Sequence, residues 1–108
     1  MALFSKAAAA QTRISIDSVG AHIGDSAIVC TRVYGIKTTD KVTFINMGAP
    51  FPNAPLTVVV FAKDLPALKD KLDTLITDKQ VCVTGKLITY RGKTEIIVSR
   101  TEDIVVQP

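Results

Sequence analysis

The chain has 108 residues, of which 47% are hydrophobic and 21% are charged, and its formal net charge is +3. This length supports one domain with a modest core, and this composition indicates a folded protein rather than a disordered one. A surplus of three positive charges permits a polyanionic partner but does not require one. No apolar run of about 18 residues occurs, so the sequence predicts no membrane-spanning helix.

The first twelve residues, MALFSKAAAAQT, end in a stretch of small side chains. Ala8 and Ala10 have the A-x-A spacing of a signal-peptidase site, although a basic region and a full apolar region before it are missing. Two interpretations stay open: a signal-peptide remnant, which we favour slightly, or an ordinary N-terminal tail. We therefore place the folded domain at residues 13–108.

The predicted elements begin with a capped helical turn over residues 15–25, closed by Gly24. Residues 26–37 alternate between two faces and predict a long strand that Gly35 breaks or bulges. Its small, apolar face is assigned to the core: Ala27, Val29, Thr31 and Val33. Residues 41–47 predict the second strand, and residues 56–62 predict a third that is apolar on both faces.

The loop between the second and third strands contains Pro50, Pro52 and Pro55, together with Phe51. Proline lacks a backbone N–H donor, so neither a helix nor a central strand accommodates this density of prolines. The loop therefore presents an aromatic side chain on a stiff backbone beside a sheet.

One helix is predicted after the third strand, with Asp64 as its N-cap and Pro66 in its first turn. Its apolar stripe follows the helical period: Leu65, Leu68, Leu72, Leu75 and Ile76. Residues 79–90 predict a fourth strand, a turn at 91–93 leads to a fifth at 94–99, and residues 103–106 form a final extended segment.

This order of elements predicts an all-β fold with five strands and one α-helix between strands three and four. A parallel βαβ arrangement is excluded because only one connection is long enough to hold a helix. Five strands with this helix in about a hundred residues are typical of the OB fold, a five-stranded Greek-key barrel.

Three segments carry a resemblance to a known group: HIGDSAIVCTRVYG, TFINMGAPFPNAPLTVVVF and VCVTGKLITYRGKTEIIV. The chain resembles small bacterial OB-fold proteins related to the nucleic-acid-binding OB domains of the anticodon-binding type, over residues 14–106. The resemblance implies an OB fold, a nucleic-acid-binding role and, because members often follow a secretory signal, a periplasmic or secreted location. It implies no catalytic residue, and Thr31 stands where the group commonly has glycine.

Catalytic and metal-binding chemistry lack a supporting pattern. The single histidine, His22, has no accompanying nucleophile motif, and no His, Cys, Asp or Glu residues have the spacing of metal ligands. Glu95, Glu102 and Asp103 are expected to face solvent. We therefore expect a protein that is not an enzyme and that needs no metal or cofactor.

A binding face is predicted on strands two and three and on the two loops that flank them. Single-stranded nucleic acid is bound when bases stack on aromatic rings and Lys or Arg side chains follow the phosphates. The residues of those types at these places are Tyr34, Lys37, Phe44, Asn46, Phe51, Phe61, Lys63, Tyr90, Arg91 and Lys93. The alternative for Phe44 and Phe61 is a place in the core.

The two cysteines, Cys30 and Cys82, lie on the first and fourth predicted strands, which pair antiparallel in an OB barrel. Alternation puts both opposite the core faces, so the side chains can meet if the register brings their Cα atoms within about 4.4–6.8 Å. A disulfide would stabilise the fold by ~3–4 kcal/mol and suits an oxidising compartment. The alternative is a pair of reduced thiols in a cytoplasmic protein.

Two functional hypotheses follow. The first is a non-enzymatic OB module that binds single-stranded nucleic acid. The second is an extracytoplasmic OB module that binds a protein, peptide or glycan, or that forms a homodimer through the apolar loop around Phe51 and Pro52.

Overall fold

The computed structural model describes residues 12–73 and 80–107 of the chain. Within these residues the fold is mostly β, with eight strands, one short α-helix and three 3-10 helices. The strands are β1 (Thr12–Arg13), β2 (Ser26–Thr38), β3 (Val42–Met47), β4 (Leu56–Phe61), β5 (Gln80–Lys86), β6 (Ile88–Tyr90), β7 (Lys93–Ile97) and β8 (Ile104–Val106). The helices are η2 (Ile16–Ala21), η3 (Ala62–Asp64), α1 (Leu65–Leu72) and η4 (Thr101–Asp103).

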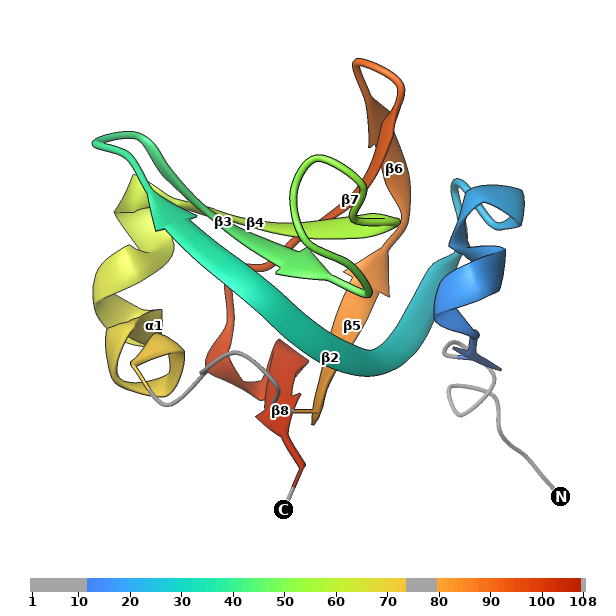
Figure 1. Ribbon diagram of the computed structural model, residues 1–108. Coiled ribbons are helices and arrows are strands. Elements are labelled where there is room, and N and C mark those ends of the chain that lie inside the picture. Colours follow the sequence, from blue (N-terminus) through green and yellow to red (C-terminus); the bar gives the residue numbers. More distant parts are fainter. Residues whose placement is uncertain (1–11, 74–79, 108) are drawn as a thin grey trace, which may run out of the picture.

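The strands form one strongly curved sheet in the order β6-β7-β4-β3-β2-β5-β8, with β1 beside β2 (Figure 1). The long strand β2 holds the two halves together, because residues 26–32 pair with β5 and residues 33–38 pair with β3. Neighbouring strands run antiparallel except for the parallel pairs β1–β2 and β4–β7. The strand path ends at β6 and β8, so the sheet is OB-like but open, and the predicted closed barrel is wrong in this respect.

The predicted count of five strands is also too low. The predicted strand over residues 79–90 divides at Leu87 into β5 and β6. The side chain of Leu87 is fully buried, and its backbone N–H and C=O groups bond to Asp25 and Gly24 at 2.9 and 2.7 Å. The final extended segment is β8, and the two-residue strand β1 lies just before the predicted helical turn.

The helix follows the predicted start but is described only as far as Asp73. Asp64 occupies the N-cap position without a side-chain capping bond, and a proline lies in the first turn. Leu68 and Leu72 are buried against the sheet, whereas the predicted stripe residues Leu75 and Ile76 lie outside the described residues. No described helix has the length and apolar character needed to cross a membrane.

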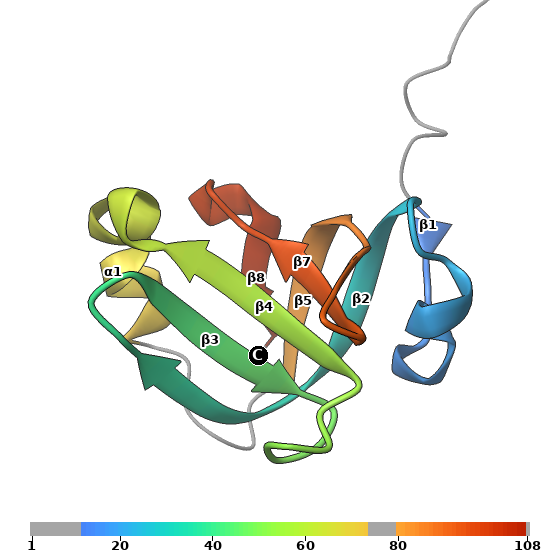
Figure 2. The same ribbon diagram turned by 90° about the horizontal axis from the view of Figure 1, so that it is seen from above.

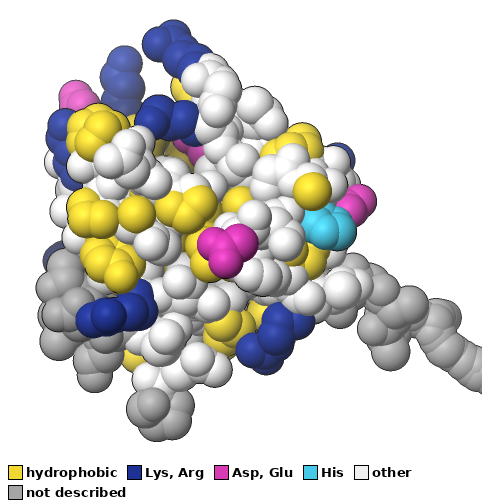
Figure 3. Space-filling view, turned by 45° about the vertical axis from the view of Figure 1, so that its right-hand side comes forward, with side chains coloured by type: hydrophobic (Ala, Val, Ile, Leu, Met, Phe, Trp, Pro, Cys, Tyr) yellow, Lys and Arg dark blue, Asp and Glu magenta, His cyan; other side chains and the backbone are white. Residues whose placement is uncertain are grey.

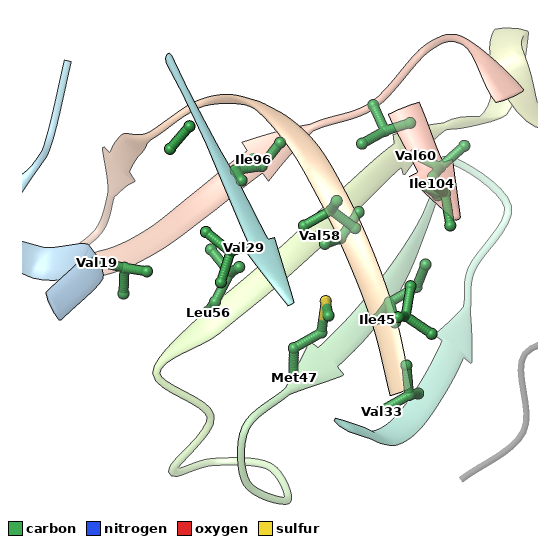
Figure 4. Packing of buried hydrophobic residues seen from close by; sticks show 14 of the residues in the cluster. Val19, Val29, Val33, Ile45, Met47, Leu56, Val58, Val60, Ile96 and Ile104 are labelled. Atoms are coloured by element: carbon green, nitrogen blue, oxygen red, sulfur yellow. The ribbon is translucent and has the colours of Figure 1, made fainter. Parts of the chain in front are cut away.

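The core lies inside the curve of the sheet and is built by strand alternation (Figure 4). On β3, Thr43, Ile45 and Met47 are buried while the residues between them are half-exposed. On β2 the predicted core face is right for Ala27, Val29 and Val33, which are fully buried, and Thr31 is half-buried. The alternation leaves Phe44 and Asn46 of β3 on the outer face of the sheet.

Two local features of β2 shape this scaffold. The register with β3 shifts between Val33 and Gly35, where a bulge was predicted. Cys30 lies directly opposite Cys82 on β5, and a disulfide joins them across Cα atoms 4.0 Å apart, closer than most bonded cysteine pairs. The strand that links the two halves is thus tied covalently to β5.

Candidate groove on the outer face

A groove of about 440 Å³ opens on the outer face of β3 and β4. The end of β2, the proline loop between β3 and β4, and the hairpin of β6 and β7 surround it (Figures 1 and 2). Its lining residues are Gly35, Ile36, Lys37, Phe44, Asn46, Phe51, Pro52, Ala54, Thr57, Tyr90, Arg91, Lys93 and Glu95. Segments far apart in the sequence therefore contribute to one concave surface.

The floor of the groove contains a cross-strand row of four residues, here called the floor row: Gly35, Asn46, Thr57 and Glu95. Each comes from a different strand, and each is the register partner of the next across β2, β3, β4 and β7. Thr57 Oγ1 donates a hydrogen bond of 3.4 Å to Asn46 Oδ1. Gly35 contributes no side chain, so the floor is open above the Asn46 amide.

The proline loop forms one wall. It leaves β3 at Gly48, whose φ of +91° is a conformation that glycine adopts at little cost. A Cβ there would lie 2.7 Å from Pro55 Cγ and 2.8 Å from Ile16 Cγ1, so the loop packs closely against η2. Phe51 is thereby presented with 73% of its surface exposed.

The β6–β7 hairpin forms the other wall and touches the proline loop. Lys93 Nζ lies 5.6 Å from the centre of the Phe51 ring and 3.5 Å from the carbonyl oxygen of Pro52. Arg91 Cζ lies 5.3 Å from the ring centre of Tyr90, which is 54% exposed. Figure 3 shows Lys and Arg side chains gathered beside hydrophobic ones at the top of the molecule, where the hairpin stands in Figure 1. Each wall therefore carries an aromatic ring, and both neighbouring cations come from the hairpin.

Glu95 is the acidic residue of the floor row, and the structure corrects the expectation that it faces bulk solvent. It is only 9% exposed, between its register partners Thr57 on β4 and Ile88 on β6. Burial raises the pKa of Glu95 above its ordinary value of 4.5, and the nearby charge of Lys93 opposes that shift without cancelling it. The carboxyl group is thus held where ionisation is less favourable than in water.

Seven of the ten predicted binding residues line the groove: Lys37, Phe44, Asn46, Phe51, Tyr90, Arg91 and Lys93. The other three lie elsewhere. Tyr34 stacks under Arg32, whose Cζ is 5.7 Å from its ring centre, and Lys63 pairs with Asp64 at 3.1 Å. Phe61 ends β4 opposite Val42, toward α1, and is 38% exposed.

Six lining residues were not among the ten predicted binding residues, although Pro52 was named for the homodimer alternative: Gly35, Ile36, Pro52, Ala54, Thr57 and Glu95. Thr57 was not selected because the predicted strand that contains it is apolar on both faces. Glu95 was assigned to solvent because an isolated carboxyl on a terminal strand usually lies there. Alternation along residues 94–97 puts Glu95 and Ile96 on opposite faces of the sheet. Because Ile96 is an apolar residue that the core buries, the sequence already indicated that Glu95 lies on the outer face.

Other polar clusters lie outside the groove. His22 Nδ1 is 3.2 Å from Asp25 Oδ2 at the exposed end of η2, and Arg100 pairs with Glu102 and Asp103 in and beside η4. No group of three or more potential metal ligands occurs in the part of the chain that the structure describes. The groove is therefore the place where aromatic, cationic and acidic groups converge.

No family model matches this chain, and no curated protein matches it. Solved structures do match. The chain is similar to the S. pombe Stn1-Ten1 complex, with a TM-score of 0.60 and 16% identity over 76% of this chain and 57% of that one. The chain thus spans little more than half the length of that relative.

Two further structures extend the comparison. An OBody bound to hen egg-white lysozyme has a TM-score of 0.69 and 15% identity over 98% of both chains. A putative aspartyl-tRNA synthetase from Leishmania major has a TM-score of 0.63 and 14% identity over 96% of this chain and 22% of that one. At these identities the likeness shows the fold alone, and that fold is an OB-like domain.

Proposed function

We propose that this protein is a non-enzymatic OB-like module that binds single-stranded nucleic acid in the groove. One observation carries the proposal. The groove has an aromatic side chain on each wall, and a cation of the hairpin lies beside each ring, Lys93 at Phe51 and Arg91 at Tyr90, around a floor of hydrogen-bonding groups. Flat rings accept stacked bases, cations contact phosphates, and polar floor groups contact base edges.

The magnitudes predict weak, salt-sensitive binding. Each stacked base contributes about 1–3 kcal/mol, so two exposed rings support an affinity in the micromolar range or weaker. Three groove cations, Lys37, Arg91 and Lys93, contact at most a few phosphates. For a single strand this predicts a slope of log affinity against log salt of about −2.

The comparisons support a binding module in general terms. One similar structure is an OBody bound to another protein, and one belongs to a putative aspartyl-tRNA synthetase, whose name includes a nucleic acid. Neither likeness identifies a ligand for this chain. The choice of nucleic acid rests on the chemistry of the groove walls.

The test is fluorescence anisotropy of labelled mixed-sequence DNA and RNA single strands at low salt. The double substitution Arg91→Glu with Lys93→Glu should reduce the affinity at least tenfold, because it reverses both cations of the hairpin wall. The matched control is Lys63→Glu with Lys69→Glu, which makes the same change in net charge near α1, outside the groove.

Equal losses in the two double variants would mean that net charge, not the groove, attracts the strand. An absence of binding by the wild-type protein to both DNA and RNA at low salt would refute the proposed function.

A second candidate function is binding of a protein, a peptide or a second copy of the chain. Exposed apolar side chains favour it: Phe51 is 73% exposed, Ile97 43% and Phe61 38%. Sedimentation equilibrium of the wild type and of Phe51→Asp tests the homodimer. A larger wild-type mass that Phe51→Asp reduces to the monomer supports it, and a monomeric wild type at high concentration contradicts it.

We also propose that the protein works in an oxidising, extracytoplasmic compartment. The disulfide between Cys30 and Cys82 supports this location, because such bonds persist outside the reducing cytoplasm. Alkylation of the protein in its native cells, before and after reduction, measures the fraction of bonded cysteines. Fully reduced thiols at the native location would contradict the proposal.

A further inference from the structure

The floor row holds a carboxylate whose oxygens have no partner among the described residues. Within residues 12–73 and 80–107, the side chain of Glu95 makes no hydrogen bond and no ion pair, although the residue is only 9% exposed. No fully buried side-chain oxygen lacks a partner in these residues, so the two carboxylate oxygens of Glu95 retain access to solvent. Because Glu95 lines the groove, that access is from the groove.

A complementary donor lies in the same row. The Oδ1 atom of Asn46 accepts the hydrogen bond from Thr57, which leaves the Nδ2 amide of Asn46 with no partner among the described residues. This amide borders the open space above Gly35, where a Cβ would be 3.9 Å away. The floor therefore offers one acceptor group and one donor group to a ligand.

These two groups act at different places on the floor. Thr57 lies between Asn46 and Glu95 in the floor row, and Nδ2 of Asn46 faces Gly35, on the side away from Glu95. One strand separates Asn46 from Glu95, so their Cα atoms are about 10 Å apart. The hydrogen bonds to one base edge are nearly parallel and lie side by side, so the Glu95 carboxylate meets a base edge without the Asn46 amide.

We propose that Glu95 selects a base that presents adjacent N–H donors on its Watson–Crick edge, and that guanine fits this carboxylate best. The two carboxylate oxygens accept the N1–H and N2–H donors of guanine. Thymine and uracil offer one N–H between two carbonyl groups and fit less well. Cytosine and adenine present an amino donor beside an unprotonated ring nitrogen, so one oxygen accepts a hydrogen bond while the other faces a lone pair.

The environment of Glu95 explains why an unpaired carboxylate there would discriminate strongly. Desolvation holds its pKa above the ordinary value, and Lys93 on the same strand is the neighbouring charge that opposes this shift. A ligand that donates hydrogen bonds to both carboxylate oxygens replaces the water they have lost, whereas a ligand that places a lone pair or a carbonyl against one oxygen leaves that oxygen unsatisfied. The site thus rejects the wrong base as well as accepting the right one.

The inference rests on the proposed function, and its test keeps the two apart. Labelled deoxycytidine 11-mers carry one central base, which is cytosine, adenine, thymine, guanine or inosine. Wild-type protein should bind the guanine strand about 5- to 100-fold more tightly than the cytosine strand at one salt concentration. Inosine, which lacks the N2 amine, should fall between guanine and cytosine.

The variant Glu95→Gln should lose most of the guanine preference and keep its affinity for the all-cytosine strand within about threefold. The matched control Glu102→Gln makes the same change in net charge at an exposed position outside the groove, and it should keep the preference. Circular dichroism and urea unfolding verify that both variants are folded.

The possible outcomes separate the two ideas. If every strand binds equally to the wild type, the inference fails and the proposed function stands. If guanine preference survives Glu95→Gln, a different group reads the base and the inference is wrong. If no strand binds at low salt, both the proposed function and the inference fail.

Discussion

The outer face of β3, β4 and β7 has two contrasting ends. At the hairpin end, the floor row carries an amide, a hydroxyl and a carboxyl group between two raised walls. Two residues further along each strand, toward α1, the outer face carries an apolar row made of Phe44, Val59 and Ile97. Beyond this row, Val42 lies opposite Phe61. The same three strands, with the same alternation, thus present a polar surface at one end and an apolar one at the other.

This contrast indicates that the two walls of the groove, the proline loop and the β6–β7 hairpin, distinguish the candidate site from the rest of the outer face. The polar row lies under the proline loop and the hairpin, which partly exclude water and confer on Glu95 its buried setting. Of the three residues in the apolar row, Phe44 is the one that lines the groove. Ile97, at the β7 end of that row, is 43% exposed. The floor row therefore suits the polar edge of a small group such as a base, and the apolar row suits contact with another apolar surface.

The largest expected effect concerns the scaffold beneath both ends. Replacing Cys30 and Cys82 with alanine should lower the free energy of unfolding by about 3–4 kcal/mol, because the disulfide closes a long loop in the unfolded chain. Urea unfolding of the double variant and the wild type measures the loss. Oligonucleotide affinity at a temperature where both are folded should not change, since neither cysteine lines the groove.

The next effect separates the two ends directly. Phe51→Ala should weaken oligonucleotide binding by about 5- to 100-fold, the loss of one stacked base. Phe61→Ala removes the same ring from the apolar end and should change affinity less than about twofold, because Phe61 does not line the groove. Anisotropy titrations of both variants with one mixed-sequence strand make the comparison. A larger loss in Phe61→Ala would place the binding surface at the apolar end.

The smallest effect is a change in pH dependence at the polar end. Folding raises the pKa of Glu95 above 4.5. Between pH 4.5 and the raised pKa, the Glu95 carboxyl is therefore more protonated in the folded state than in the unfolded state. The contribution of Glu95 to stability therefore falls across that interval. Glu95→Gln should remove this fall and be relatively more stable near neutral pH than in acid. Urea midpoints of both proteins between pH 4 and about pH 8 measure it, and parallel profiles would contradict the burial effect.

Much of this architecture could be predicted from local patterns. The alternation of β2 predicted a core face that is correct at Ala27, Val29 and Val33, and the prolines placed a stiff loop carrying Phe51 between β3 and β4. The division of the predicted fourth strand could not be predicted, because it depends on backbone bonds from Leu87 to residues just before β2. Those bonds join segments that the sequence places far apart.

By itself the sequence determined an OB-like arrangement of mostly β elements, one helix after β4, and a face on which aromatic and cationic side chains lie together. These features follow from periodicity and turn chemistry, which act between residues close in the chain. Only the tertiary structure decided that the sheet stays open and that Glu95 on β7 lies beside Thr57 on β4 in a buried row. The physical reason is that burial, and with it the chemistry of a carboxyl group, depends on which distant strands become neighbours.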